Sequence, residues 1–132
     1  MRSRILYLSA GHDDARRLSL MLNDLPMDID HAANLKQARA MLRQSDYDII
    51  LSEGSLSDGT WIDSLHLSRD SARDLKVIVT DPHADARFWA EALNLGAYDV
   101  LAQPFYSPEV RRILFNACSR PLQTPELQHL VA

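Results

Sequence analysis

The stretch YDIILSEGSLSDG, residues 47–59, decides the fold class of this chain. Its first half is a short apolar run bounded by polar residues, a pattern typical of a buried β-strand. Glu53 follows this run and therefore stands at the carboxyl end of the expected strand, where a turn begins. We ask what a lone glutamate does in such a place.

Four further strand patterns alternate with helix patterns on either side of this run. The strands are expected at Arg4–Leu8, Met27–Ala32, Asp48–Ser52, Lys76–Thr80 and Asp99–Ala102. The helices are expected at Asp13–Leu22, after Asn34, after Thr60, at 85–95 and after Ser107. Strictly alternating strands and helices favour right-handed crossovers and a parallel sheet with helices on both faces. The sequence therefore predicts a doubly wound α/β fold.

Helix-capping residues precede several of these helices, and apolar residues at helical spacing follow them. Asn34, Thr60 and Ser107 are the expected N-caps, and Gly96 is expected to end the fourth helix. In the third helix we expect Trp61, Ile62, Leu65 and Leu67 to face inward, and in the fourth Ala86, Ala90 and Leu93. This phase leaves Phe88, Trp89 and Ala92 near the flanks or outside.

The composition is that of a single acidic domain. The 132 residues suit one domain over 1–120, with a tail or linker at 121–132. With 14 basic and 18 acidic residues the net charge is −4. The sequence has no basic stripe, so we do not expect direct nucleic-acid binding. No apolar run approaches the roughly 18 residues of a membrane span, so we expect a cytoplasmic protein. Cys118 is the only cysteine and is expected to be a buried, inert thiol.

A functional site in such a sheet is expected where the strands end. Ligands of open α/β sheets bind outside the carboxyl ends of the strands, at the point where the strand order reverses. Residues to inspect are therefore Ser9–Gly11, Glu53–Ser55, Thr80, Asp81 and the Gln103–Pro104 pair.

Several motifs at these strand ends resemble the receiver domain of two-component response regulators. The matching pieces are YDIIL, LSDG at Leu56–Gly59, VIVT ending on Thr80, GAYDVL from Gly96, and QPF at Gln103–Phe105. The resemblance covers residues 4–119 and implies a flavodoxin-like (βα)5 fold with strand order 2-1-3-4-5. It also implies a cis peptide bond before Pro104.

The residues that carry phosphorylation in that family are replaced here, with one exception. The family has an acidic pair that binds magnesium, an aspartate that accepts the phosphoryl group, and a threonine and a lysine that contact this group. These positions fall on Ser9 and Ala10, on Glu53, and on Thr80 and Gln103. Only Thr80 fits the family pattern. The sequence therefore predicts no magnesium site, no cofactor and no catalysis, because hard cations need carboxylate oxygens and a phosphoryl group needs positive charge.

Two interpretations of Glu53 stay open. It is one methylene longer than the family's aspartate and is the only carboxylate left at the three core positions. In one interpretation Glu53 accepts hydrogen bonds from Thr80 and the Gln103 amide and imitates a bound phosphoryl group, which holds an active-like state. In the other, Glu53 is merely structural.

Other charged and ring residues receive simpler interpretations. Asp13 and Asp14 are expected in the first turn of a helix, where they favour its dipole, and Asp58 in a tight turn. Asp81 is expected to be a solvated loop residue. The histidines show no ligand spacing, so we assign no metal role to His12, His31, His66, His83 and His129.

The resemblance also indicates a partner surface formed by the fourth helix, fifth strand and fifth helix. The family's switch aromatic corresponds to Val100, which cannot act as a ring does. Candidate interface residues are Phe88, Trp89, Arg111, Arg112 and Phe115.

The function that we expect is that of an atypical, non-phosphorylatable receiver domain in bacterial signal transduction or transcription regulation. Its partner is a second copy, another protein, or an output domain in a longer parent chain. Two alternatives stay open. One is a receiver phosphorylated on Glu53 or Asp58, and the other is a flavodoxin-like small-ligand binder.

Overall fold

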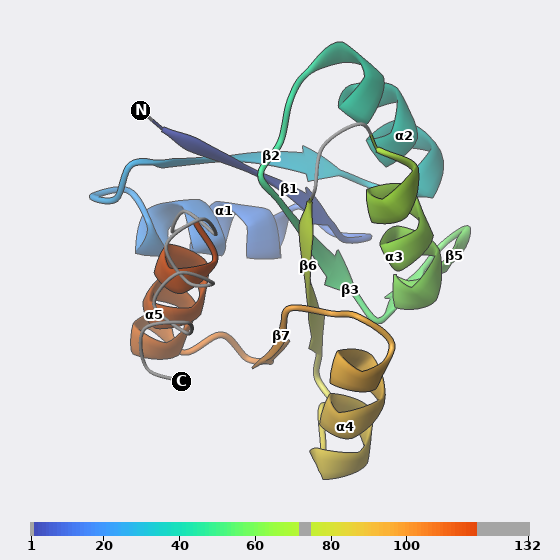
Figure 1. Cartoon of the computed structure of the whole chain (residues 1–132). Coiled ribbons are helices and arrows are strands. Elements are labelled where there is room, and N and C mark those ends of the chain that lie inside the picture. The colour runs from blue at the N-terminus through green and yellow to red at the C-terminus, as the bar shows by residue number, and fades with distance from the viewer. Residues whose placement is uncertain (1, 72–74, 119–132) are drawn as a thin grey trace, which may run out of the picture.

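The computed structural model describes residues 2–71 and 75–118 and shows one twisted sheet between two layers of helices (Figure 1). The predicted tail at 121–132, and His129 within it, lie outside the described residues. The large strands are β1 Ser3–Leu8, β2 Met27–Ala32, β3 Ile49–Glu53, β6 Lys76–Asp81 and β7 Asp99–Ala102. The helices are α1 Asp13–Met21, α2 Leu35–Gln44, α3 Trp61–Asp70, α4 Ala86–Asn94 and α5 Ser107–Cys118.

The large strands form a parallel five-stranded sheet in the order β2-β1-β3-β6-β7. This confirms the predicted α/β fold and its strand order, because β6 and β7 are the fourth and fifth strands of that sheet. A two-stranded hairpin of β4 Ser55–Leu56 and β5 Gly59–Thr60, which the sequence analysis did not predict, lies between β3 and α3.

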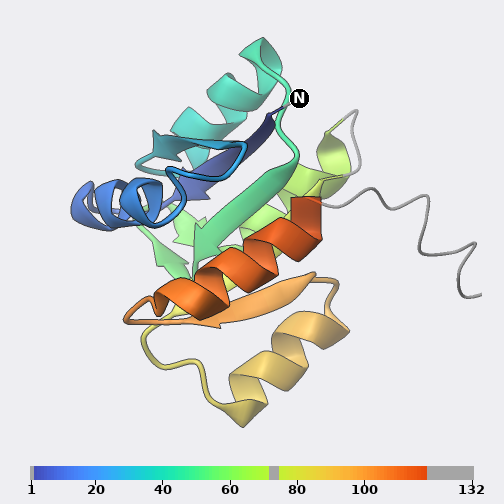
Figure 2. The same ribbon diagram turned by 90° about the vertical axis from the view of Figure 1, so that its left-hand side faces the viewer.

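Each face of the sheet is covered by its own helices. Leu18 of α1 and Val110 of α5 are buried in one apolar cluster, which lies against Ile5 and Leu51 of the sheet. Leu35 of α2, Trp61 of α3 and Ala92 of α4 belong to the cluster on the other face. Figure 2 shows α5 crossing in front of the sheet while α4 lies apart from it, beside β7.

Two of the three predicted N-caps are confirmed, whereas Ser107 is itself the first residue of α5. Asn34 accepts a hydrogen bond from the Gln37 backbone N–H at 2.8 Å and so caps α2. Thr60 and Asp63 form a reciprocal capping box at the start of α3. After α4 the chain turns at Gly96, which has a φ of +115° that favours glycine.

Two inward stripes differ from the prediction. In α3, Ile62 is 38% exposed, whereas the buried side chains are Trp61, Ser64, Leu65 and Leu67. In α4 the predicted stripe is wrong. Ala92 is buried and Leu93 is 43% exposed, so the helix is turned about its axis relative to our expectation.

Within the described residues, no helix is long and apolar enough to cross a membrane. Cys118 is only partly buried, and burial raises the pKa of its thiol. A raised pKa leaves less thiolate at neutral pH, which agrees with the expectation of an inert thiol but not with full burial.

Candidate functional site

The carboxyl ends of β1, β3, β6 and β7 bring the predicted site residues together at one edge of the sheet. The strand register pairs Leu8 with Ser52, and Glu53 with Thr80. Ser9, Glu53, Thr80 and Gln103 therefore belong to neighbouring strand ends, although they are far apart in the sequence. Glu53 is the last residue of β3 and is partly buried.

Three donors converge on the Glu53 carboxylate. The Ala10 backbone N–H donates to Oε1 at 3.4 Å, while Gln103 Nε2 and the Tyr7 hydroxyl donate to Oε2 at 3.4 and 3.5 Å. All three distances are long for hydrogen bonds of this kind. The arrangement surrounds one anion with neutral donors that come from β1 and β7.

The structure corrects the predicted role of Thr80. Its hydroxyl is fully buried and has no hydrogen-bond partner in the described structure, so it does not donate to Glu53. A buried hydroxyl without a partner costs free energy, on the order of 1–3 kcal/mol. Of the two donors that the sequence analysis assigned to Glu53, only Gln103 reaches it.

Tyr7 is a site residue that the sequence analysis missed. Its side chain is fully buried, and its ring lies edge-on to those of His31 and Phe105 at centroid distances of 6.1 and 6.3 Å. Burial raises the pKa of the Tyr7 hydroxyl, and the Glu53 charge raises it further. The phenol therefore remains a protonated donor toward Glu53 at all ordinary pH values.

His31 is the second missed residue. It precedes the last residue of β2, and the register places it beside Tyr7. Its Nε2 lies 2.8 Å from the Ser9 carbonyl oxygen and 3.0 Å from Ser9 Oγ, while Ser9 Oγ donates to the Gly11 carbonyl at 2.7 Å. The order of adjacent strands could have predicted this contact, because β2 neighbours β1 in the expected sheet.

The loop after Glu53 is fastened on both sides. The Gly54 N–H donates to the Thr80 carbonyl, and the Gly54 carbonyl accepts from the Trp61 N–H, at 3.0 and 3.1 Å. A Cβ at Gly54 would collide with the Asp81 carboxylate. Asp81 is therefore not a solvated loop residue: it ends β6, is partly buried, and accepts from the His83 N–H at 2.8 Å.

Asp58 has a larger role than that of a turn residue. Its two carboxylate oxygens accept from the Leu35 and Lys36 N–H groups at 2.9 and 3.1 Å, at the start of α2. The hydrogen bond from Leu35, followed by that from Lys36, holds the pKa of Asp58 below its usual range. Asp58 therefore joins the β4–β5 hairpin to α2.

The remaining predicted residues are found as follows. Val100 is fully buried in β7, and the Gln103–Pro104 peptide bond is cis. Asp13 and Asp14 occupy the first turn of α1. His12 directly precedes α1, and its ring centroid lies 4.7 Å from that of His31.

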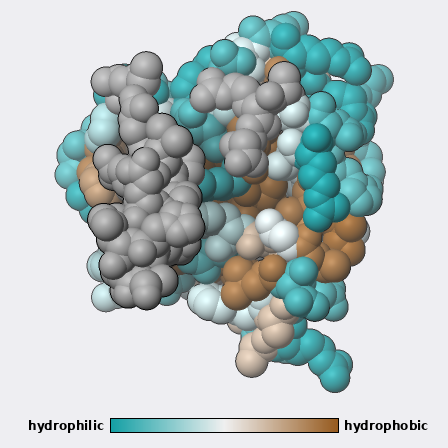
Figure 3. Space-filling view, in the orientation of Figure 1, coloured by the Kyte–Doolittle hydropathy of each residue, from teal (hydrophilic) through white to brown (hydrophobic). Residues whose placement is uncertain are grey.

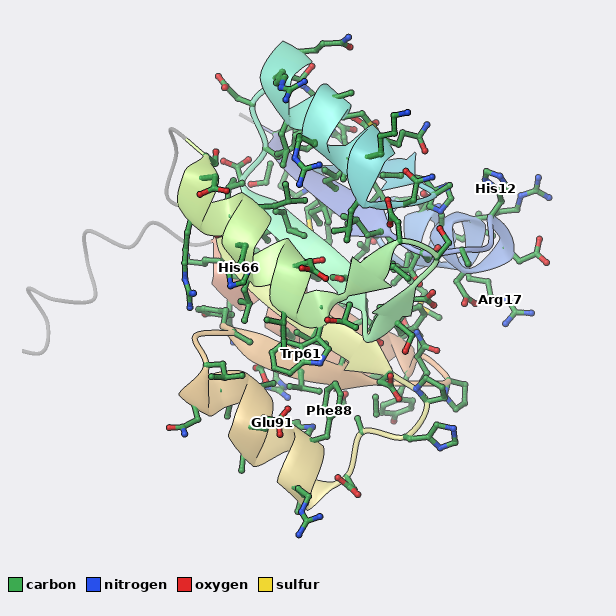
Figure 4. All side chains as sticks on the ribbon, turned by 90° about the vertical axis from the view of Figure 1, so that its right-hand side faces the viewer. His12, Arg17, Trp61, His66, Phe88 and Glu91 are labelled. Atoms are coloured by element: carbon green, nitrogen blue, oxygen red, sulfur yellow. The ribbon has the colours of Figure 1, made fainter. Side chains whose placement is uncertain are left out.

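Two of the predicted interface residues, Phe88 and Arg111, make contacts within the chain. Phe88 is partly buried, and its ring centroid lies 5.8 Å from that of Trp61. Figure 4 shows the two side chains next to each other. Arg111 forms two hydrogen bonds with Asp24, at 2.6 and 3.0 Å, on the side of α5 that faces α1. Trp89, Arg112 and Phe115 are exposed. Apolar surface gathers on the side where α3 and α4 lie (Figure 3).

The sequence of this chain is similar to those of response regulators. The family model described as "Response regulator receiver domain" matches residues 12–115. The response regulator protein PilR of Pseudomonas aeruginosa is 24% identical over 127 residues. That alignment covers 96% of this chain, which spans only 28% of the length of PilR.

Solved structures show the same fold. The signal receiver domain of a LuxO repressor protein from Vibrio parahaemolyticus has a TM-score of 0.81 at 21% identity, covering 99% of this chain and 98% of that one. The beryllofluoride-activated NtrC4 receiver domain dimer has a TM-score of 0.78 at 22% identity, covering 86% and 94%. The matched fold, together with the family model over most of the length, identifies this chain as a member of the response regulator receiver domain family.

Proposed function

We propose that this receiver domain is not switched by phosphorylation and acts as a protein-interaction module in bacterial signal transduction or transcription regulation. The observation that carries the proposal is the state of the strand-end pocket. Its single central carboxylate, Glu53, already accepts hydrogen bonds from the donors of the pocket. Glu53 therefore already uses the donors that a bound phosphoryl group would need.

The residues at the family's magnesium position do not fit a magnesium ion. Mg²⁺ is held by oxygen ligands, chiefly carboxylates, in near-ideal octahedral geometry. Here the Ser9 hydroxyl is committed to the Gly11 carbonyl and to His31, and the side chain of Ala10 is a methyl group that offers no ligand atom. We derive no magnesium-dependent step for this chain.

The charge balance also opposes phosphoryl transfer. A phosphoryl group carries negative charge that receiver pockets offset with a metal ion and a lysine. At the corresponding place this chain has the neutral amide of Gln103, which lies 3.4 Å from Glu53. An incoming phosphoryl group would meet the Glu53 carboxylate with a neutral amide in place of the family's lysine, and the interaction between the two anions is repulsive.

The alternative acceptor Asp58 is poorly placed for phosphorylation. Both of its oxygens accept hydrogen bonds from the first turn of α2, so phosphorylation of one oxygen would remove a helix cap. The small-ligand alternative gains no support from the strand ends either, because three of the donors there already contact Glu53.

The partner surface that we propose is centred on α4. Trp89 and Leu93 lie one helical turn apart and are 39% and 43% exposed. Phe88 points instead toward α3, so this exposed pair occupies the other flank of the helix, toward β7 and α5. Exposed aromatic side chains are frequent anchors of protein interfaces. We propose a second copy of the chain as the partner, with an output domain in a longer parent chain as the regulated element.

A titration with a phosphoryl mimic tests the central claim. Beryllofluoride with Mg²⁺ is added while the fluorescence of Trp61 and Trp89 is recorded, because the Trp61 N–H contacts the loop that follows Glu53. We expect no saturable response. The matched positive control is the variant that restores the family residues, S9D/A10D/E53D/Q103K, which should respond. A saturable response of the unmodified chain would refute the proposal.

A further inference from the structure

Two histidines meet at the same corner of the molecule where the family has its acidic pair. His12 belongs to the β1–α1 loop and His31 to β2, so they are 19 positions apart and form no sequence motif. Their ring centroids lie 4.7 Å apart with an interplanar angle of 66°. Ser9 and Ala10 thus stand at the positions of the family's acidic pair, and two imidazoles lie close together at the same corner.

The separation of the two rings suits joint coordination of one metal ion. With metal–nitrogen bonds of about 2.0–2.1 Å and an angle of about 90–110° between them, two imidazoles place their centroids about 4.5–5.2 Å apart. The distance between His12 and His31 falls inside this range. His12 is exposed, so its ring is free to turn toward a shared ligand.

The hydrogen bonds of His31 fix the tautomer that a metal ligand needs. A carbonyl oxygen only accepts, so the contact of 2.8 Å with the Ser9 carbonyl requires that Nε2 carries the proton. In the neutral ring the lone pair is then on Nδ1, which leaves this atom able to act as a metal ligand. Metal-binding histidines usually donate their other N–H to a carbonyl or carboxylate in this way.

We propose that His12 and His31 form a binding site for a divalent transition-metal ion that prefers nitrogen ligands, such as Zn²⁺ or Cu²⁺. Imidazole is a good ligand for these ions and a poor one for Mg²⁺. Within residues 2–71 and 75–118, no group of three or more His, Cys, Asp and Glu side chains lies close enough to hold a metal ion. The two imidazoles therefore supply two ligands, and water completes the coordination.

Calorimetric titration with Zn²⁺ measures the site, with His66 as the matched control. His66 is an exposed histidine on α3, well apart from His12 in Figure 4. We expect His12→Ala and His31→Ala each to weaken Zn²⁺ binding at least about tenfold, while His66→Ala leaves it unchanged. Equal affinity of the unmodified chain and His12→Ala would overturn the proposal. His12→Ala alone suffices if His31→Ala fails to fold, because the exposed His12 contributes little to the core.

Paramagnetic broadening locates the ion independently. Substoichiometric Cu²⁺ should broaden the imidazole NMR signals of His12 and His31 before those of His66 and His83. Simultaneous broadening of all four would show adventitious binding to single imidazoles only and would overturn the proposal. The inference does not rest on the proposed function. The Zn²⁺ titration tests the histidine site and the titration with Mg²⁺ and beryllofluoride tests the proposed function, so either can fail without the other.

Discussion

At the scale of single residues, Asp58 shows how one carboxylate connects two parts of the fold. It lies in the hairpin that follows β3, yet it accepts the Leu35 and Lys36 N–H groups that begin α2. Those N–H groups have no partner within their own helix, and the helix dipole favours an anion beside them. Asp58 therefore stabilises α2 from a distance of more than 20 residues in sequence.

Replacement of Asp58 by alanine should lower the midpoint of urea unfolding at neutral pH. The pKa of Asp58 is lowered in the folded state, so the charged carboxylate stabilises the fold fully above the pKa of an unfolded aspartate, which is about 3.9. As the pH falls through the lower folded pKa, this contribution is lost. The difference between the unmodified chain and Asp58→Ala should therefore be largest at pH 7 and shrink toward pH 3.

The control for this measurement is Asp70→Ala, which removes an exposed carboxylate near the end of α3. There the dipole of the helix does not favour an anion, so the substitution should not lower the midpoint. A pH-independent loss in Asp58→Ala would mean that the turn, not the charge, needs aspartate.

Glu53 should act locally. Its three hydrogen bonds have donor–acceptor distances of 3.4–3.5 Å, which makes each of them weak. We expect Glu53→Gln to change backbone NMR shifts around Ala10, Tyr7 and Gln103 and to leave those around Trp89 unchanged. Shifts that extend to Trp89 would instead support the interpretation of Glu53 as an imitation of a bound phosphoryl group.

At the residue level, the sequence analysis identified one of the two donors that it assigned to Glu53, and it missed the contacts of Tyr7 and His31. The contact between Gln103 and Glu53 was predicted from the family alignment and is present. Thr80 was assigned to the same carboxylate, but its hydroxyl is buried without a partner. The length of a glutamate side chain allows several positions for its oxygens, and the sequence alone does not choose between them.

At the scale of elements, α4 is the helix whose orientation the sequence predicted least well. The helix has alanines at 86, 90 and 92, so several apolar stripes are possible and spacing alone does not distinguish them. The structure buries Ala92 and turns Phe88 onto Trp61 of α3. The large aromatic side chain decides the orientation, because its contact with Trp61 removes more apolar area from water than an alanine can.

Phe88→Ala should therefore loosen α4. Full burial of a phenylalanine would predict a loss of about 3–5 kcal/mol, and we expect about 1–2 kcal/mol because Phe88 is only partly buried. Urea unfolding measures the loss, and hydrogen exchange of the α4 amides should become faster. Arg87→Ala is the control on the same helix, since the Arg87 side chain is exposed and is not one of the two proposed interface residues, and should change stability by less than about 0.5 kcal/mol. Equal effects of the two substitutions would contradict the assigned orientation.

At the scale of the whole molecule, the fold was predictable because one pattern repeats five times. Each strand run, such as Lys76–Asp81, is followed by a helix with an apolar face, and only a parallel sheet with two helix layers buries all of them. The hairpin of β4 and β5 was not predictable in this way. Its two-residue strands are too short to carry a periodic pattern. Its position depends on the hydrogen bond that Asp58 accepts from the Leu35 N–H of α2.

The arrangement of α4 on the whole molecule predicts how copies of the chain associate. With Phe88 turned inward, the large exposed apolar side chains of α4 are Trp89 and Leu93, on the flank toward β7, whose outer edge has no strand neighbour within the described sheet. Leu20 of α1 is more exposed, at 66%, but α1 lies on the opposite face of the sheet. If exposure alone caused association, Leu20 would matter more than Trp89. If an aromatic anchor at the α4 flank causes it, Trp89→Ala should reduce the solution mass from dimer to monomer while Leu20→Ala leaves the dimer intact. Light scattering coupled to size-exclusion chromatography distinguishes these outcomes. If the unmodified chain, Trp89→Ala and Leu20→Ala are all monomers, a second copy does not bind at the Trp89 flank, and this flank is then assigned to a different protein partner.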